Sequence, residues 1–312
     1  MKKTKIHSHT YLSALSAPVL VIALLFLVSC SAVETGVDFL ADQGKISESD
    51  KESILKTGEA LRSSFSDITE EEEYYIGRSV AALILDRYPV YENEALTAYV
   101  NTVGQAVVYS SDRPEIFAGY HFLVLDSDEV NAMAAPGGFI FVTRGLIKRC
   151  ASEEMLAAVL AHEVGHVAAR HGLQSIKKSR LIDAFRLIGT EAAQRSGSEE
   201  LIKLTSVFEG MLGDVVATLV ERGYDRKFEY EADASALKST AAIGYSPAGL
   251  TAFLEVLRAE APSAASAGWF KTHPAPADRL DRAAQVLATM TGFPQEEPVR
   301  TKRFKQNTAG LK

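Results

Sequence analysis

The feature that most restricts the fold of this chain is the motif HEVGH, which runs from His162 to His166 inside the apolar stretch LAAVLAHEVGHVAARHG. Residues four apart on an α-helix differ by about 40° in direction, so one helix would present both imidazoles to a single point, as two ligands of a zinc ion require. Glu163 lies one step round the same helix, where its carboxylate can reach a metal-bound water. Gly165 costs a helix about 1 kcal/mol relative to alanine, and its bare backbone would let a substrate or another segment come close.

The two histidines need a third ligand, and the residues directly after them do not supply it. His171 comes five residues after His166, about 140° away from the ligand face of a continuous helix. The extended motif of the metzincins would need a glycine at Ala169 and a histidine at Gly172. A third ligand must therefore come from another helix. The alternative interpretation is a pair of histidines hydrogen-bonded to backbone carbonyls.

A second predicted helix offers carboxylates at a suitable spacing. In the segment RKFEYEADASA, Glu229 and Asp233 are four apart on one helical face. One of them can bind a metal while the other reaches the outer N–H of a ligand histidine. Glu231 points to another side of the helix and is expected to be solvated. An ordinary acidic helix with a wet face would show the same residues, so this segment by itself does not establish a metal site.

The spacing of apolar residues predicts a helical body around one small sheet, which is an α+β fold. The first helix begins at a cap formed by Asp67 or Thr69, and a second covers about 93–108. The segments HFLVLD, VNAMAA and FIFVT, separated by SDE and PGG, predict a three-stranded meander beside the HEVGH helix. Further helices are expected at about 152–171, 175–195, 198–222, 224–242, 246–260 and 276–290.

The N-terminus predicts an exported lipoprotein. Three lysines precede the apolar run VLVIALLFLV, which continues into LVSC; this resembles the bacterial lipobox, in which the cysteine is lipidated. We therefore expect residues 1–29 to be a signal peptide and Cys30 to carry a membrane anchor. Ser31 is not acidic, which in similar lipoproteins goes with sorting to the periplasmic face of the outer membrane. The alternatives are an ordinary cleaved signal with an incidental cysteine, or an uncleaved N-terminal helix.

The net charge of the chain limits its possible binding partners, and the remaining segments can be assigned from their composition. Loss of residues 1–29 removes three lysines and changes the formal net charge from −7 to −10, which gives no electrostatic basis for binding nucleic acid. Residues 30–68 are expected to form a tether with a short helix, 69–292 the main domain and 293–312 a tail. Cys150 is expected to be a small buried residue.

The run LIKLTSVFEGMLGDVVATLV is long enough to require a test as a membrane span. Lys203, Glu209 and Asp214 interrupt it, which favours a core or lid helix. Contact of an amphipathic helix with a membrane surface is the alternative.

Four motifs together resemble peptidase family M48, the zinc endopeptidases that include the CAAX prenyl proteases and several periplasmic proteases. In chain order they are NAMAAPGG with VTRGLI, HEVGH, the segment from Arg226 to Asp233, and THPAPADRL, and they cover about residues 70–290. The several transmembrane helices of the CAAX proteases have no counterpart in the sequence, so the lipoprotein branch is more similar. The resemblance implies a mainly helical zincin domain of the gluzincin type.

The resemblance also implies the residues of a metal site. His162, His166 and Glu229 would bind one zinc ion per chain. Glu163 would act as the general base, and Asp233 would bind the outer nitrogen of a ligand histidine.

Three further features follow from the same resemblance. His273 would lie near the metal, either as a fourth ligand in a resting state or as a group that stabilises the oxyanion; the alternative is a capping or packing role. Arg279 is expected to form a structural ion pair rather than to touch substrate. An extended substrate would pair with an edge strand, for which the alternative is an ordinary solvent-facing edge. The edge-strand residues are Asn131, Ala132, Met133 and Ala134.

The predicted function is therefore that of a zinc endopeptidase that cleaves misfolded or unassembled envelope proteins. A different class of function, a chaperone or assembly factor that holds clients in the same groove, is the main alternative. A lipoprotein scaffold with a vestigial site is a third hypothesis, and the intact set of predicted ligands argues against it.

Overall fold

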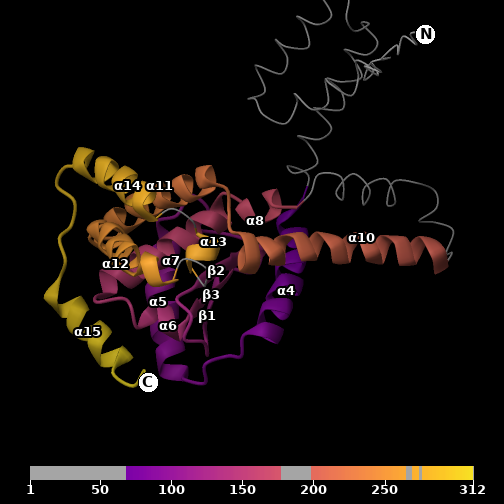
Figure 1. The fold of residues 1–312 in the computed structure, drawn as a ribbon, viewed down its shortest axis with the longest axis horizontal. Coiled ribbons are helices and arrows are strands. Elements are labelled where there is room, and N and C mark those ends of the chain that lie inside the picture. The colour runs from indigo at the N-terminus through magenta and orange to yellow at the C-terminus, as the bar shows by residue number, and fades with distance from the viewer. Residues whose placement is uncertain (1–67, 177–197, 265–268, 274–275, 312) are drawn as a thin grey trace, which may run out of the picture. The chain divides into compact units, whose positions relative to one another are not determined.

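The computed structural model describes residues 68–176, 198–264, 269–273 and 276–311 (Figure 1). The predicted signal peptide, the lipid site Cys30 and the tether up to residue 67 lie outside these residues, and so does nearly all of the helix predicted at 175–195. No helix among the described residues is long and apolar enough to cross a membrane. The elements of the first half are α4 (Glu70–Arg87), α5 (Glu94–Tyr109), β1 (His121–Leu125), β2 (Ala132–Ala135), η1 (Pro136–Gly138), β3 (Phe139–Thr143), α6 (Arg144–Ile147), α7 (Glu153–Ala168) and α8 (His171–Gln174).

The regular elements of the second half are all helical among the described residues, and three of them differ from the sequence prediction. The helix expected at 198–222 ends earlier and continues as a short π-helix, and we expected neither the short helix at Trp269–Thr272 nor the helix in the tail. The elements are α10 (Ser198–Ala217), η3 (Thr218–Arg222), α11 (Arg226–Ala242), α12 (Ala248–Ala264), α13 (Trp269–Thr272), α14 (Pro276–Thr289) and α15 (Pro298–Thr308).

Side-chain caps explain where the first helices begin. Of the two predicted caps of α4, Thr69 is the one that forms: its hydroxyl accepts from the backbone N–H of Glu72, and the Glu72 carboxylate accepts from the backbone N–H of Thr69. Asn93 caps α5 and Ser152 caps α7 by accepting from N–H groups of the first turn.

The mainly helical α+β fold with a three-stranded sheet is confirmed, but the predicted meander is wrong. The strand order is β1-β3-β2, with β3 parallel to β1 and antiparallel to β2. The turn at Pro136–Gly138 joins β2 and β3 as a hairpin, and β1 pairs with the opposite edge of β3. Arg144, directly after β3, donates to Asp126 and Asp128 in the segment after β1, which holds the ends of the two parallel strands together. The three apolar runs are the same in either strand order, so the sequence does not distinguish the two orders.

Alternate residues of the strands face two different helical layers, and Figure 1 shows the sheet between α4 and α5. Both faces are buried, which is why the strands read as apolar runs. The face in the same core as α5 and α7 consists of Phe122, Val124, Ala132, Ala134, Ile140 and Val142. The face in the same core as α4, α10 and η3 consists of Leu125, Met133, Ala135 and Phe141.

The hairpin turn is fixed by close backbone contact with α4. Gly137 and Gly138 adopt φ values of 69° and 90°, which glycine tolerates without a steric penalty. The backbone N–H of Gly137 donates to the buried Glu73 carboxylate at 3.4 Å. A Cβ built on Gly77 would lie 1.8 Å from the carbonyl oxygen of Pro136. The position of β2 therefore depends on the absence of a side chain at this point of α4.

We expect Gly77→Ala to destabilise the protein by about 1–3 kcal/mol or more, because the new methyl group must push α4 away from the turn. Gly213→Ala is the matched control, since nothing lies within 4 Å of a Cβ at that helical position. The control should be neutral or up to about 1 kcal/mol more stable. Urea unfolding of both variants measures the difference, and equal stability of the two would contradict the packing described here.

The C-terminal helix α15 packs onto the beginning of α7. Phe304 enters the main hydrophobic core. The Arg303 guanidinium donates to the fully buried Glu153 carboxylate, with 2.7 Å between Nε and Oε2. Tyr99 and Tyr245 donate their hydroxyls to the same carboxylate at 2.9 and 2.7 Å. The segment that the sequence presents as a tail thus fixes one end of the helix that carries HEVGH.

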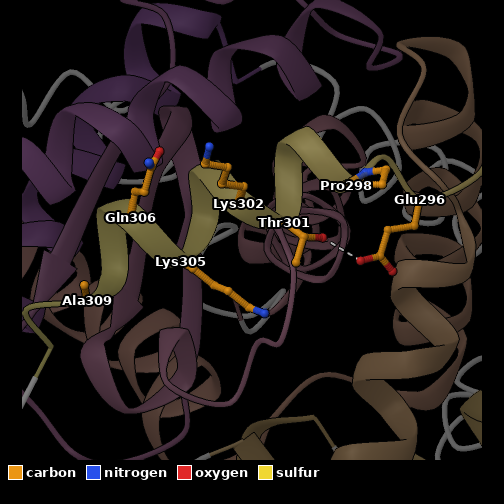
Figure 2. Close-up of a pocket in the computed structure, with 7 residues that line it drawn as sticks. All are labelled: Glu296, Pro298, Thr301, Lys302, Lys305, Gln306 and Ala309. Atoms are coloured by element: carbon orange, nitrogen blue, oxygen red, sulfur yellow. Dashed lines mark hydrogen bonds between the residues drawn. The ribbon is translucent and has the colours of Figure 1, made fainter.

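A surface pocket follows the outer side of α15 (Figure 2). It lies apart from the residues in which the sequence predicts chemistry and does not bear on the metal site. Its lining consists of Glu296, Pro298, Thr301, Lys302, Lys305, Gln306 and Ala309.

Candidate metal centre

Helix α7 lies in the middle of the fold and packs closely against α11. Their separation is set by Gly165, because a Cβ built there would lie 3.2 Å from the Ala232 Cα and from the Ser235 Cβ. The bare backbone that the sequence analysis assigned to a substrate or another segment therefore faces α11. This close approach brings the HEVGH motif next to the carboxylates of the second helix.

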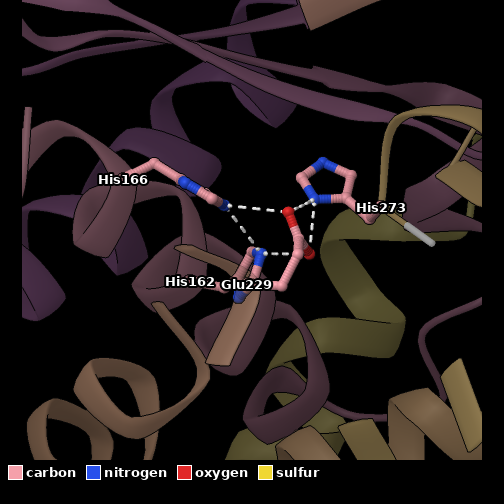
Figure 3. A group of neighbouring side chains, drawn as sticks. All are labelled: His162, His166, Glu229 and His273. Carbon is pink, nitrogen blue, oxygen red and sulfur yellow. Dashed lines mark hydrogen bonds and ion pairs between the residues drawn. The ribbon is translucent and has the colours of Figure 1, made fainter. Parts of the chain in front are cut away.

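Four side chains from three segments meet at one point (Figure 3). His162 and His166 reach it from α7, Glu229 from α11 and His273 from the end of α13, and each offers one ligand atom within 4.8 Å of the others. All four are buried. The Nε2 atoms of the α7 pair are 3.1 Å apart, and each lies 3.6 Å from one oxygen of the Glu229 carboxylate.

These distances fit a tetrahedral metal. Ligand bonds of about 2.0–2.2 Å in tetrahedral geometry place neighbouring donor atoms about 3.3–3.6 Å apart. The separations of 3.1 and 3.6 Å lie close to this range, and the two distances of 3.6 Å end on different oxygens of Glu229. Two imidazoles and one carboxylate are also the donor set of many catalytic zinc sites, which keep one further position for water or substrate. The residues present therefore fit a zinc ion.

Glu163 is buried beside the cluster, and neither of its carboxylate oxygens accepts a hydrogen bond from another described protein group. Burial raises the pKa of this carboxyl above its ordinary value, although His273 and His162 oppose the shift. The nearest of these groups is the Nε2 atom of His273, 3.7 Å from Glu163 Oε1. A buried carboxylate without a partner is costly, and such groups concentrate at sites of proton transfer.

Asp233 contacts the outer nitrogen of one candidate ligand. Its Oδ1 atom lies 2.9 Å from Nδ1 of His162. The buried guanidinium of Arg279 donates to both Asp233 oxygens at 2.8 and 2.6 Å, and Nη1 lies 2.9 Å from Glu229 Oε2. Arg279 therefore makes the ion pairs expected of it, and it holds both carboxylates of α11.

Burial and nearby charges together set the pKa values of these groups. Burial would raise the pKa of Glu229, but His273 and Arg279 outweigh it and hold the pKa well below its ordinary value. Burial lowers the pKa of His166 well below its ordinary value, and His162 acts in the same direction. Burial and Arg279 would lower the pKa of His162, but the Asp233 and Glu229 carboxylates outweigh them and raise it to about 9. Metal binding requires ionised carboxylates and neutral imidazoles, so it would release a proton from His162.

His273 lies between two carboxylates. Its Nδ1 atom is 3.0 and 3.1 Å from the two oxygens of Glu229, and the ring stacks on Trp269 with centroids 4.1 Å apart. The Trp269 backbone N–H donates to the carbonyl of Val130, directly before the edge strand, at 2.6 Å. The short helix α13 thus joins the predicted mobile histidine to the predicted substrate strand.

The residues of the predicted edge strand are buried, and β2 does form an edge of the sheet. The peptide groups of Asn131 pair with Thr143 of β3, so those of Ala132 and Ala134 face the other way. The hydroxyl of Tyr224 lies 3.4 Å from the Ala134 carbonyl oxygen on that unpaired side. Met133 and its neighbours are covered, so this edge is open neither to solvent nor to a substrate in the conformation described.

Two aromatic contacts at the site were not foreseen from the sequence. Tyr224 stacks on His166 with ring centroids 4.2 Å apart. His171, which a continuous helix would place off the ligand face, has its Nδ1 atom 2.8 Å from Nδ1 of His166. The predicted helix 152–171 in fact ends at Ala168, and Arg170 adopts a left-handed φ of 57°. The only sequence signal for this break is the Gly172 that follows.

Comparison with known proteins gives a family match over most of the described chain. The model of Peptidase family M48 matches residues 94–287. The beta-barrel assembly-enhancing protease of Escherichia coli is 26% identical over 220 residues, which are 69% of this chain and 44% of that protein. Mitochondrial metalloendopeptidase OMA1 of Schizosaccharomyces pombe is 26% identical over 232 residues, 72% of this chain and 64% of its own. Metalloprotease LoiP of Escherichia coli is 31% identical over 159 residues, 51% and 59% of the two chains. The chain spans less than half of the assembly-enhancing protease that it matches.

Proposed function

The chain belongs to peptidase family M48, and from this membership we propose that it is a zinc-dependent endopeptidase of envelope proteins. The observation that carries the proposal is the convergence of His162, His166, Glu229 and His273 beside a buried, unpartnered Glu163. The predicted resemblance to this family is thereby confirmed. We also propose the substrate class, the identity of the metal and the catalytic roles of the residues.

His162, His166 and Glu229 would hold one zinc ion per chain, and Asp233 would fix the orientation of His162. A bound zinc supplies a Lewis acid that polarises a peptide carbonyl and lowers the pKa of water toward about 7. The Asp233 carboxylate would accept a hydrogen bond from the Nδ1–H group of His162, 2.9 Å away, which leaves the lone pair of Nε2 free to bind a metal. The same feature is common among histidines that bind catalytic metals.

Glu163 would take the proton from the attacking water and pass it to the leaving amine. Its burial suits the first step, because a raised pKa makes the carboxylate a stronger base, and the proton that it then holds is available for the leaving amine. General acid–base catalysis of this kind contributes typically about 10² to 10⁴ in rate. His273, with Nε2 directed at Glu163 and Nδ1 at Glu229, would be the second catalytic group, either by closing the site at rest or by stabilising the oxyanion.

The substrate would lie extended along the unpaired side of β2 after the segment with Tyr224, which covers that side in this structure, has moved. The peptide groups of Ala132 and Ala134 face that side, and main-chain pairing gives affinity with little sequence preference. Asn131 and Met133 pair with β3 instead and would fix the strand that receives the substrate. Little sequence preference suits an enzyme that removes unfolded proteins.

Misfolded or unassembled envelope proteins are the proposed substrates. This follows from the predicted export signal and from similarity to a protease whose name describes assembly of β-barrels. We propose an anchor at a lipidated Cys30 and a location on the periplasmic face of the outer membrane.

The test is metal analysis of the purified protein together with a casein digest. We expect about one zinc ion per chain and cleavage that stops when a chelator removes the metal. Restoring zinc should restore cleavage. A protein that binds no zinc, or one that cleaves casein equally well with chelator present, would contradict the proposal.

A further inference from the structure

The two histidines of HEVGH have different partners on their outer nitrogens. His162 uses Asp233, at 2.9 Å. Nδ1 of His166 instead faces Nδ1 of His171 at 2.8 Å. The second nitrogen of His171, Nε2, lies 3.4 Å from Oε2 of Glu231. A chain of three side chains therefore leads from the metal cluster to the protein surface, where the Glu231 side chain is 62% exposed.

The backbone break after α7 is what places His171 in this chain. Arg170 is the one residue other than glycine with a positive φ among the described residues, and such a conformation persists only where the surrounding structure holds it. Its guanidinium forms an ion pair with the buried Glu73 carboxylate at 2.9 Å. Without this left-handed residue, His171 would continue along α7 and point away from His166. The turn at Arg170 thus places the imidazole of His171 next to that of His166.

Packing also fixes the ring of His171. The residue is fully buried, and its ring stacks on Phe228 with centroids 4.2 Å apart. Phe228 and Glu231 both belong to α11, the helix that carries the candidate ligand Glu229. Helix α11 therefore supplies the candidate ligand Glu229 and also holds His171, which contacts the candidate ligand His166.

The direction of the hydrogen bonds follows from proton counting. Two ring nitrogens 2.8 Å apart need one donor and one acceptor. A metal on Nε2 of His166 leaves the proton on Nδ1, which must donate. His171 Nδ1 must then accept, so its proton resides on Nε2 and faces the Glu231 carboxylate. The tautomer of His166 thus determines that of His171.

We infer that His171 is a positioning residue for the ligand His166 and that Glu231 acts through His171; this inference rests on the proposed zinc site. His171 fixes the tautomer and orientation of His166 and increases the basicity of Nε2. Glu231, which the sequence presents as a solvated carboxylate, holds the proton of His171 on the side away from the ligand.

The test is zinc affinity, measured by competition with a chromogenic chelator in the full-length protein. His171→Leu removes the acceptor and should weaken zinc binding about 10- to 100-fold, the usual effect of losing such an outer partner. His171→Asn places a carbonyl oxygen near the position of Nδ1 and should stay within about threefold of wild type. Cobalt spectra of the two variants add a readout of ligand geometry that a loss of stability alone would not change.

Glu231→Gln tests the exposed end of the series His166–His171–Glu231 without disturbing buried packing. It should weaken zinc binding by up to about tenfold, whereas Glu255→Gln, a loss of charge at an exposed position of α12, should leave the affinity unchanged. In the His171→Leu background, Glu231→Gln should have no further effect, because the connection to the ligand is already broken.

Several outcomes would overturn the inference. Wild-type affinity in His171→Leu, or equal weakening in His171→Leu and His171→Asn, would leave no role for the acceptor. An effect of Glu231→Gln that persists in the His171→Leu background would show that Glu231 acts by bulk charge. If His171→Leu does not fold, equal zinc affinities of Glu231→Gln and Glu255→Gln would contradict the proposed roles of His171 and Glu231. A wild-type protein without zinc would instead defeat the proposed function itself.

Discussion

Glu163→Gln is expected to abolish casein cleavage, with a loss of about 10² to 10⁴ in kcat, while the protein still binds zinc. Glutamine has the shape of glutamate but cannot accept a proton from water at neutral pH. Because Glu163 is not among the candidate ligands, zinc content should remain about one per chain. Burial raises the pKa of Glu163, so a neutral side chain should also be tolerated and the thermal stability of the metal-free protein should not fall.

The same variant separates the proposed protease from the chaperone hypothesis. Metal analysis, melting temperature and casein cleavage should be measured on one preparation, with Glu255→Gln as a control for loss of a carboxylate elsewhere. Undiminished cleavage by Glu163→Gln would refute its role as general base. Retention of the biological effect by a variant that no longer cleaves would favour a chaperone or assembly factor.

Arg279→Leu is expected to lower the stability of the metal-free protein by about 3–5 kcal/mol at neutral pH, the usual loss when one partner of a buried ion pair is removed. The Arg279 guanidinium is 1% exposed and contacts both Asp233 and Glu229 at distances of 2.6–2.9 Å. Its removal leaves the carboxylates of Asp233 and Glu229 buried without this guanidinium. Urea unfolding of the metal-free protein measures the loss.

Saturating zinc should reduce this loss, because a divalent cation bound by Glu229 would replace part of the missing charge and would bind only the folded state. Arg279→Lys keeps a charge but not the bidentate geometry and should lose less stability than Arg279→Leu. Arg258→Leu removes a cation from an exposed position of α12 and should change stability by no more than about 0.5 kcal/mol. A loss in Arg279→Leu no larger than in Arg258→Leu would contradict the structural role of the ion pairs.

The sequence by itself identified the parts of the site that depend on spacing along one helix. The convergence of His162 and His166 follows from helical geometry, and so does the common face of Glu229 and Asp233. Which of these two carboxylates joins the histidines did not follow from spacing; the family resemblance indicated Glu229, and the structure brings it to the cluster. Helix starts at Thr69 and Asn93 were also predictable, because a cap is a contact between residues three apart in the chain.

The tertiary structure decided everything that depends on partners distant in sequence. Apolar runs between turn signals predicted the three strands but not their order, since a run records which residues are buried and not which strand lies beside them. The neighbour of Gly165 proved to be α11, and the tail proved to hold the buried Glu153 through Arg303. His171 joined the site because a left-handed Arg170 interrupts the helix that spacing predicts to be continuous. Periodicity describes one element at a time, whereas the partner of each polar group is fixed only when the elements pack together.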